Sequence, residues 1–124
     1  MAKIMIADDS DAIRMVLKDI LQIGNHQLVS EAIDGMDAVE KFEASQPDLL
    51  LLDFAMPKKD GLGALKEIIQ KNPKAKVIMI TASDNKNTRK ECMDIGSSAF
   101  ILKPFDFNEV LKIISDVLAE PIKN

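Results

Sequence analysis

At 124 residues the chain is long enough for one domain with a single hydrophobic core. The net charge of −4 argues against a nucleic-acid-binding surface, which is usually basic. Cys92 is the only cysteine and cannot form an internal disulfide, which fits a reducing compartment. No apolar run approaches the roughly 20 residues that cross a bilayer, and Asp8 and Asp9 come too early for a signal peptide. We expect a cytoplasmic, monomeric protein with no membrane or nucleic-acid partner.

Strands and helices are predicted to alternate along the whole chain. Short apolar runs predict five strands, at Lys3–Ala7, Leu28–Ile33, Leu49–Asp53, Lys76–Thr81 and Ala99–Leu102. Apolar residues at helical spacing predict a helix from a cap at Ser10 or Asp11 to Gly24, helices at Met36–Ser45 and Gly61–Lys71, and a last helix capped by Asp106 with Glu109. This alternation predicts an α/β fold with a parallel sheet covered on both faces.

A fourth helix, between Ser83 and Gly96, has a weaker pattern. Cys92, Met93 and Ile95 are its clearly apolar residues. Thr88 with Glu91 could form a capping box that starts this helix late. Because so little apolar surface is available for burial, we expect the helix to be loosely held.

Asp53 is the most informative residue, because it ends a run of four leucines. Leu49 to Leu52 lack helical periodicity and read as a strand buried on both faces. Ligands of parallel α/β sheets bind outside the carboxyl ends of the strands. A carboxylate at this strand exit is therefore a candidate functional group.

Two more acids, Asp8 and Asp9, follow the first strand. Helix capping is the alternative role for them, although Ser10 and Asp11 are also available as caps. Three acids at one sheet edge would repel one another and raise each other's pKa. A hard divalent cation such as Mg²⁺ removes that cost, and two carboxylates with a backbone carbonyl from the Phe54–Ala55 turn would suit it.

Polar residues also end the fourth and fifth strands. Thr81 is either an ordinary strand residue with a solvated hydroxyl or a hydrogen-bond donor to a phosphoryl oxygen. Lys103 is either a surface residue or a point charge that reaches inward to phosphate or carboxylate. Pro104 restricts Lys103 to extended geometry, and a cis bond between them is compatible with the sequence. Together these groups predict attack by ionised Asp53 on phosphorus, with Mg²⁺ and Lys103 offsetting the charge.

In these motifs the chain resembles the receiver domain of two-component response regulators, CheY-like proteins in particular. The resemblance covers essentially all of residues 1–124 as a single receiver domain without an output domain. The motifs that carry it are Asp8-Asp9, Asp53 with Met56-Pro57, Asp60-Gly61, Thr81-Ala82, Phe100 and Lys103-Pro104-Phe105.

The resemblance implies a flavodoxin-like (βα)5 fold, with strand order 2-1-3-4-5, and Mg²⁺-dependent phosphorylation of Asp53 by a sensor histidine kinase. It implies that Asp9, Asp53 and the Ala55 carbonyl touch the metal, with Asp8 acting mainly through water. Thr81, Lys103 and the Ala82 amide would contact the phosphoryl group. Phe100 would occupy the aromatic switch position and turn inward when Thr81 moves.

Two departures from the family pattern stand out. Many members have Tyr at the switch position, so Phe100 offers a partner no phenolic hydroxyl. The position two after the phosphoacceptor is often polar and here is Ala55, which borders the path of hydrolytic water. The resemblance therefore does not fix the lifetime of the phosphorylated state.

The partner remains open between two kinds of stand-alone regulator. The sequence of the first helix favours a chemotaxis type, which would take phosphate from a chemotaxis kinase and control a motor or an adaptor protein. The alternative is a phosphorelay intermediate, and a phosphatase could be a further partner. The output surface would be the fourth helix, fifth strand and fifth helix.

Three other functions are less compatible with the sequence. A phosphatase of the haloacid dehalogenase type needs a second Asp where Ala55 stands. A flavodoxin-type cofactor carrier needs a Gly-, Ser- and Thr-rich phosphate loop where Asp8 and Asp9 stand. A degenerate receiver would not keep the complete acidic set. We assign no functional role to His26, expected at the surface, to Cys92, expected to be packed, or to the seven methionines, expected in the core.

Overall fold

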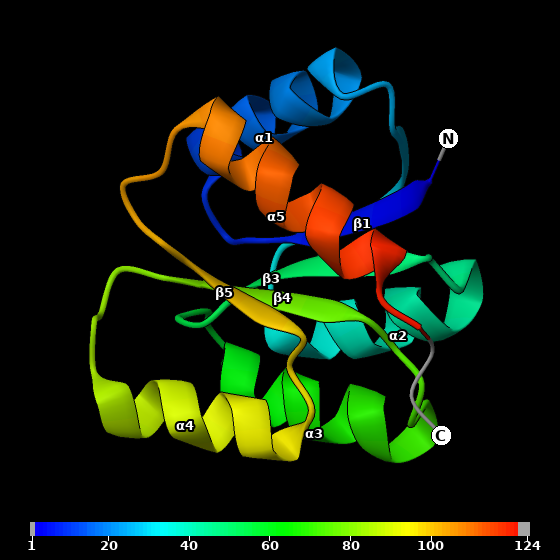
Figure 1. The fold of residues 1–124 in the computed structure, drawn as a ribbon. Coiled ribbons are helices and arrows are strands. Elements are labelled where there is room, and N and C mark those ends of the chain that lie inside the picture. Colours follow the sequence, from blue (N-terminus) through cyan, green and yellow to red (C-terminus); the bar gives the residue numbers. More distant parts are fainter. Residues whose placement is uncertain (1, 122–124) are drawn as a thin grey trace.

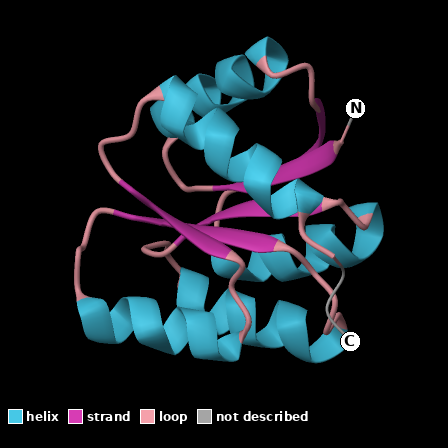
Figure 2. Cartoon of the chain, in the orientation of Figure 1, coloured by secondary structure: helices cyan, strands magenta, loops and turns pink. Residues whose placement is uncertain are grey.

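The chain forms a five-stranded parallel sheet with helices on both faces, in a computed structural model that describes residues 2–121 (Figures 1 and 2). The strands are β1 (Lys3–Ala7), β2 (Gln27–Ala32), β3 (Leu49–Asp53), β4 (Val77–Thr81) and β5 (Ala99–Leu102). The helices are α1 (Asp11–Ile23), α2 (Gly35–Ser45), α3 (Gly61–Lys71), α4 (Lys86–Ile95) and α5 (Phe107–Ala119). The strand order is β2-β1-β3-β4-β5, so the predicted α/β, flavodoxin-like fold is confirmed.

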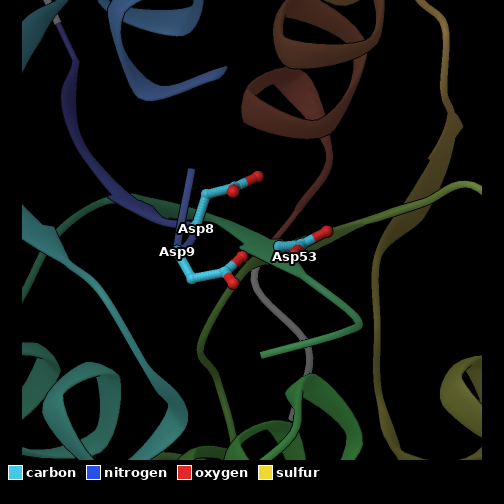
Figure 3. A group of neighbouring side chains, drawn as sticks. All are labelled: Asp8, Asp9 and Asp53. Carbon is cyan, nitrogen blue, oxygen red and sulfur yellow. The ribbon is translucent and has the colours of Figure 1, made fainter. Parts of the chain in front are cut away.

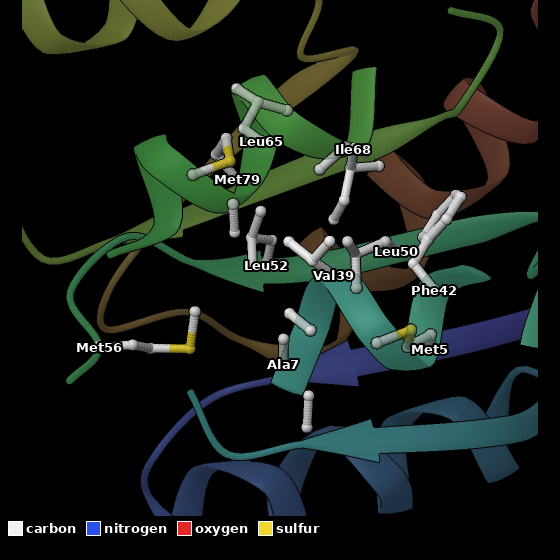
Figure 4. Packing of buried hydrophobic residues seen from close by; sticks show 14 of the residues in the cluster. Met5, Ala7, Val39, Phe42, Leu50, Leu52, Met56, Leu65, Ile68 and Met79 are labelled. Carbon is white, nitrogen blue, oxygen red and sulfur yellow. The ribbon is translucent and has the colours of Figure 1, made fainter. Parts of the chain in front are cut away.

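Each face of the sheet has its own apolar core. Because side chains alternate along a strand, β3 sends Leu49 and Leu51 to one face and Leu50 and Leu52 to the other. All four leucines are fully buried, as the sequence predicted. Helices α1 and α5 cover the first face, and α2, α3 and α4 cover the second (Figure 1). Figure 4 shows the second core, where α2 and α3 pack on alternate residues of β1, β3 and β4.

Side-chain caps fix where the helices begin. Ser10 Oγ accepts a hydrogen bond from the Ile13 amide at 3.2 Å and starts α1. The Asp106 carboxylate accepts from the Glu109 amide at 2.7 Å and starts α5, as predicted. None of the helices in the described part of the chain is long and apolar enough to cross a membrane.

The predicted start of α4 at Thr88 is wrong. The helix begins at Lys86, because the Asn85 side chain accepts from the amides of Asn87 and Thr88, at 2.9 and 3.3 Å. The first turn is entirely polar, so apolar periodicity could not reveal it. The weak packing is confirmed, since Cys92 is the one buried residue among the ten described residues of α4.

Two expectations about single residues need correction. His26 is partly buried rather than on the surface, and its Nδ1 atom is buried without a hydrogen-bond partner among the described residues. The methionines are not all in the core; Met1 lies outside the described residues, Met5, Met56 and Met79 are buried, and Met15, Met36 and Met93 are exposed. Cys92 is fully buried, as expected.

Candidate functional site

Three carboxylates meet at the carboxyl edge of the sheet. Strands β1 and β3 are parallel neighbours, with Ala7 opposite Leu52, so Asp8 and Asp53 leave the sheet side by side. One carboxylate oxygen from each of Asp8, Asp9 and Asp53 lies within 4.8 Å of the others. Figure 3 shows the three side chains beside one another. Asp8 and Asp53 are buried and Asp9 is exposed, so Asp9 is the member of the cluster that reaches solvent. The sequence prediction that these acids converge is confirmed.

Lys103 reaches into this cluster from the end of β5. Its Nζ lies 3.0 Å from Asp53 Oδ1 and 3.3 Å from Asp8 Oδ2. Its backbone amide donates to the Thr81 carbonyl at 2.7 Å, which ties the exits of β4 and β5 together. The peptide bond between Lys103 and Pro104 is cis. Lys103 is therefore an inward-facing ammonium group rather than a surface lysine.

The cluster shifts the pKa of two of its members. Burial raises the pKa of Asp53 above its usual value; the Lys103 hydrogen bond opposes this shift, and the negative charges of Asp8 and Asp9 add to it. For Lys103, burial acts to lower the pKa, but the hydrogen bond and charge of Asp53, together with Asp8, outweigh it and raise the pKa. The surroundings of Asp53 thus disfavour its charged form, and an added cation would offset that effect.

The donor atoms fit a hard divalent cation. Among the described residues, Lys103 is the one cationic side chain in contact with the three carboxylates, so their negative charge is only partly balanced. Carboxylate oxygens are the ligands that Mg²⁺ and Ca²⁺ prefer. Asp8, Asp9 and Asp53 could therefore hold a metal ion.

Two glycines let the backbone close around the site. A Cβ on Gly61 would lie 2.2 Å from the Asp53 carbonyl oxygen, and a Cβ on Gly35 would lie 1.9 Å from the Lys59 carbonyl oxygen. The Gly61 amide also donates to the Phe54 carbonyl at 2.7 Å. The loop after β3 is thus folded against the starts of α2 and α3 at positions that no side chain would permit.

Thr81, Ala82 and Ala55 lie at the same edge of the sheet, and Phe100 lies further back along β5. Thr81 is buried, and its Oγ1 accepts from the Ser83 amide at 3.1 Å, so its hydroxyl is not solvated. Ala82 and Ala55 are exposed, in the loops after β4 and β3. Phe100 lies on β5 opposite Met79 and is partly buried.

Two contacts near the site were not found from the sequence. Arg14 of α1 donates from Nη1 to the Asp8 carbonyl at 2.7 Å. The Arg89 guanidinium lies 5.5 Å from the centroid of the Phe100 ring and 3.6 Å from Asp84. The ion pair between Arg14 and Asp11 could have been predicted, because the two residues are three apart on one helix. Nothing in the sequence indicated the contacts between different elements.

Comparison with known proteins agrees with this geometry. The family model of the response regulator receiver domain matches residues 4–115. The chemotaxis protein CheY of Bacillus subtilis is 40% identical over 116 residues, covering 94% of this chain and 97% of the relative. Protein CcdB of the same organism is 36% identical over 118 residues, covering 95% and 98%.

A solved structure is similar over nearly its full length. The CheX–CheY–BeF3–Mg²⁺ complex from Borrelia burgdorferi contains a chain that superposes with a TM-score of 0.93 at 32% identity, covering 96% of this chain and 90% of that one. Sequence, fold and acidic pocket therefore agree: the chain belongs to the response regulator receiver domain family, whose members are signalling phosphoacceptors rather than conventional enzymes.

Proposed function

We propose that Asp53 accepts a phosphoryl group from a sensor histidine kinase and that this modification switches the surface of α4, β5 and α5. The most direct support is the placement of Asp53. Its carboxylate is buried at a strand exit, 3.0 Å from Lys103 Nζ and within 4.8 Å of two further carboxylates. A carboxylate in this position could accept a phosphoryl group while the neighbouring carboxylates hold a metal ion.

The chemistry assigns one role to each group. A carboxylate oxygen of Asp53 attacks phosphorus, the bond from phosphorus to the histidine nitrogen breaks, and an acyl phosphate forms. Asp53 and Asp9, with the Ala55 carbonyl, would hold Mg²⁺, and Asp8 would act through water. Bound Mg²⁺ would offset negative charge on the carboxylates and the phosphoryl oxygens. Lys103 already lies beside Asp53 and would pair with a phosphoryl oxygen.

Thr81 and Phe100 would carry the signal away from the site. The Thr81 Oγ1 accepts a hydrogen bond from the Ser83 amide and keeps its own O–H, which would donate to a phosphoryl oxygen. The Ala82 amide would be a second donor. Movement of Thr81 would free space into which Phe100 turns, and Phe100 would then lose its present contact with Arg89.

The thin packing of α4 would allow this change to spread. One buried side chain, Cys92, anchors the ten described residues of α4, so residues 83–95 should exchange between arrangements readily. Amide hydrogen exchange tests this, with and without a phosphoryl mimic. Protection in α4 equal to that in α1 under both conditions would refute it.

We assign the protein to stand-alone regulators of chemotaxis, located in the cytoplasm, with a chemotaxis kinase upstream and a motor or adaptor protein downstream. The support is the similarity to CheY proteins at 35–40% identity, with 96–97% of three such relatives matched. A phosphorelay intermediate is the alternative. Phosphotransfer separates them, since a relay protein would pass the phosphoryl group on to a histidine of a second protein.

Acetyl phosphate provides the test of the central step. The protein incubated with acetyl phosphate and Mg²⁺ should gain the mass of one phosphoryl group, as an acid-stable and base-labile adduct. Asp53→Asn should abolish the adduct. Asp48→Asn is the matched control, because Asp48 is an exposed acid one residue before the other end of β3 and should not be required. An adduct that survives Asp53→Asn would refute the assignment.

A further inference from the structure

Arg14 makes three polar contacts that link α1, the loop after β1, and the edge strand β2. Nη1 donates to the Asp8 carbonyl at 2.7 Å, Nε donates to Glu31 Oε1 at 3.2 Å, and Nη2 pairs with the Asp11 carboxylate. The side chain is 12% exposed although it carries a full charge. A planar guanidinium can donate in several fixed directions at once, which an ammonium group cannot do.

The carbonyl that Arg14 holds belongs to the peptide between Asp8 and Asp9. Asp8 is fixed from two further directions, since its amide donates to the Ala32 carbonyl at 3.1 Å and its Oδ1 accepts from the Ser10 amide at 2.8 Å. In the described part of the chain, no hydrogen bond or ion pair reaches the exposed Asp9 carboxylate. The direction of Asp9 therefore depends on the backbone that Arg14 orients.

Glu31 holds Arg14 in turn. Its second oxygen, Oε2, is 3.2 Å from Lys18 Nζ, and its backbone carbonyl accepts from Lys41 Nζ at 2.7 Å. The guanidinium is thus braced by a carboxylate that is itself tied to α1 and α2. Groups that orient metal ligands through hydrogen bonds commonly change metal affinity 10–100-fold when removed.

We infer that Arg14, braced by Glu31, is a positioning residue for the metal site: it fixes the peptide between Asp8 and Asp9 and so sets their carboxylates for Mg²⁺. This inference rests on the proposed function, because it assumes that the acidic cluster binds Mg²⁺. It goes beyond that function by assigning part of the Mg²⁺ affinity to Arg14, whose guanidinium contacts none of the carboxylate oxygens that would bind the metal.

The sign of the effect separates positioning from simple charge. Arg14 is a positive charge near a cation site, so by electrostatics alone its removal should strengthen Mg²⁺ binding. If Arg14 positions the ligands, its removal should weaken binding. Loss of stability alone would leave the affinity of the folded protein unchanged.

Isothermal titration calorimetry of the unphosphorylated protein with MgCl2 provides the test. Arg14→Met keeps much of the apolar stem and should raise the Kd for Mg²⁺ about tenfold or more. Arg14→Lys keeps the charge and should also raise the Kd, which leaves a readout if Arg14→Met does not fold. Lys112→Met is the control: it removes a positive charge from an exposed pair with Asp116 on α5, outside this network, and the Kd should stay within about twofold.

Three results would overturn the inference. They are an unchanged Kd in both Arg14 variants, a lower Kd in Arg14→Met, and an increase in Lys112→Met equal to that in Arg14→Met. Absence of saturable Mg²⁺ binding by the unsubstituted protein is distinguishable from these, because it would overturn the proposed metal site and this inference with it.

Discussion

Helices α1 and α4 follow two strands, β1 and β4, that end at the same edge of the sheet as the acidic cluster, but the two helices are attached to the sheet very differently. Helix α1 buries Leu17, Ile20 and Leu21 and is tied to β2 through Arg14 and Lys18. Helix α4 buries Cys92 among its ten described residues. The segment that carries Asp8 and Asp9 is therefore followed by a well-packed helix, while the segment after Thr81 is followed by a sparsely packed one. That difference suits a domain that holds a metal on one side and signals on the other.

The largest expected difference is in the loss of stability when a buried side chain of α1 or of α4 is shortened. Leu17 is 1% exposed, so Leu17→Ala should lower the free energy of unfolding by about 3 kcal/mol, through lost burial and the cavity left behind. Cys92→Ala removes a smaller group from α4 and should cost about 1 kcal/mol. Urea unfolding of both variants measures the difference. Equal losses would mean that α4 is held as firmly as α1.

Substitution of the glycine that ends each helix should destabilise the protein more at α4 than at α1. Gly96 ends α4 at φ 136°, which strains any residue with a Cβ, whereas Gly24 ends α1 at φ −79°, which alanine adopts freely. Gly96→Ala should cost about 1–2 kcal/mol.

Gly24→Ala is the matched control. Its Cβ would meet Leu111 Cδ2 at 2.5 Å and His26 Cδ2 at 2.9 Å, both in side chains that can shift, so the cost should be about 1 kcal/mol or less. Unfolding in urea again provides the measurement. A larger loss for Gly24→Ala would show that packing at the end of α1 outweighs backbone strain at the end of α4.

The same asymmetry explains what could be predicted from the sequence. Asp8, Asp53 and Lys103 directly follow apolar strand residues, so the parallel order of the strands was enough to bring them together. The start of α4 could not be predicted from periodicity, because Asn85 caps a turn without apolar residues.

Contacts across elements were also beyond reach. The hydrogen bonds from Arg14 to Asp8 and Glu31 depend on how α1 packs against β2. The spacing of residues along α1 does not predict that packing. The Thr81 hydroxyl was expected either to be solvated or to donate to a phosphoryl oxygen. Thr81 is buried and its Oγ1 accepts from the Ser83 amide, a contact that depends on the path of the loop after β4.

A smaller effect should come from the contact between α4 and β5. Cation–π pairs at partly exposed sites contribute about 0.5–1 kcal/mol, so Arg89→Ala should destabilise the protein by that amount. In a Phe100→Leu background the ring is absent and the same substitution should cost almost nothing. A double-mutant cycle by urea unfolding measures the coupling. Coupling indistinguishable from zero would mean that Arg89 does not hold Phe100.

The smallest expected effect is a loss of stability in mildly acid solution that arises at the end of α1, from protonation of His26. His26 is the only histidine of the sequence and lies beyond the end of α1, next to Gly24. Burial lowers its pKa below the usual 6.5. A charged imidazole would also place an N–H at Nδ1, which has no acceptor among the described residues.

The sign follows from proton binding. Because the unfolded chain binds this proton more tightly than the folded protein, stability from His26 is fully present above about pH 6.5 and is lost as the pH falls toward the lowered pKa of the folded state. Urea unfolding between about pH 8 and about pH 5.5 measures the loss. His26→Gln cannot take up this proton and should show a shallower fall in stability. Identical pH profiles for the two proteins would mean that the acid sensitivity does not arise from His26.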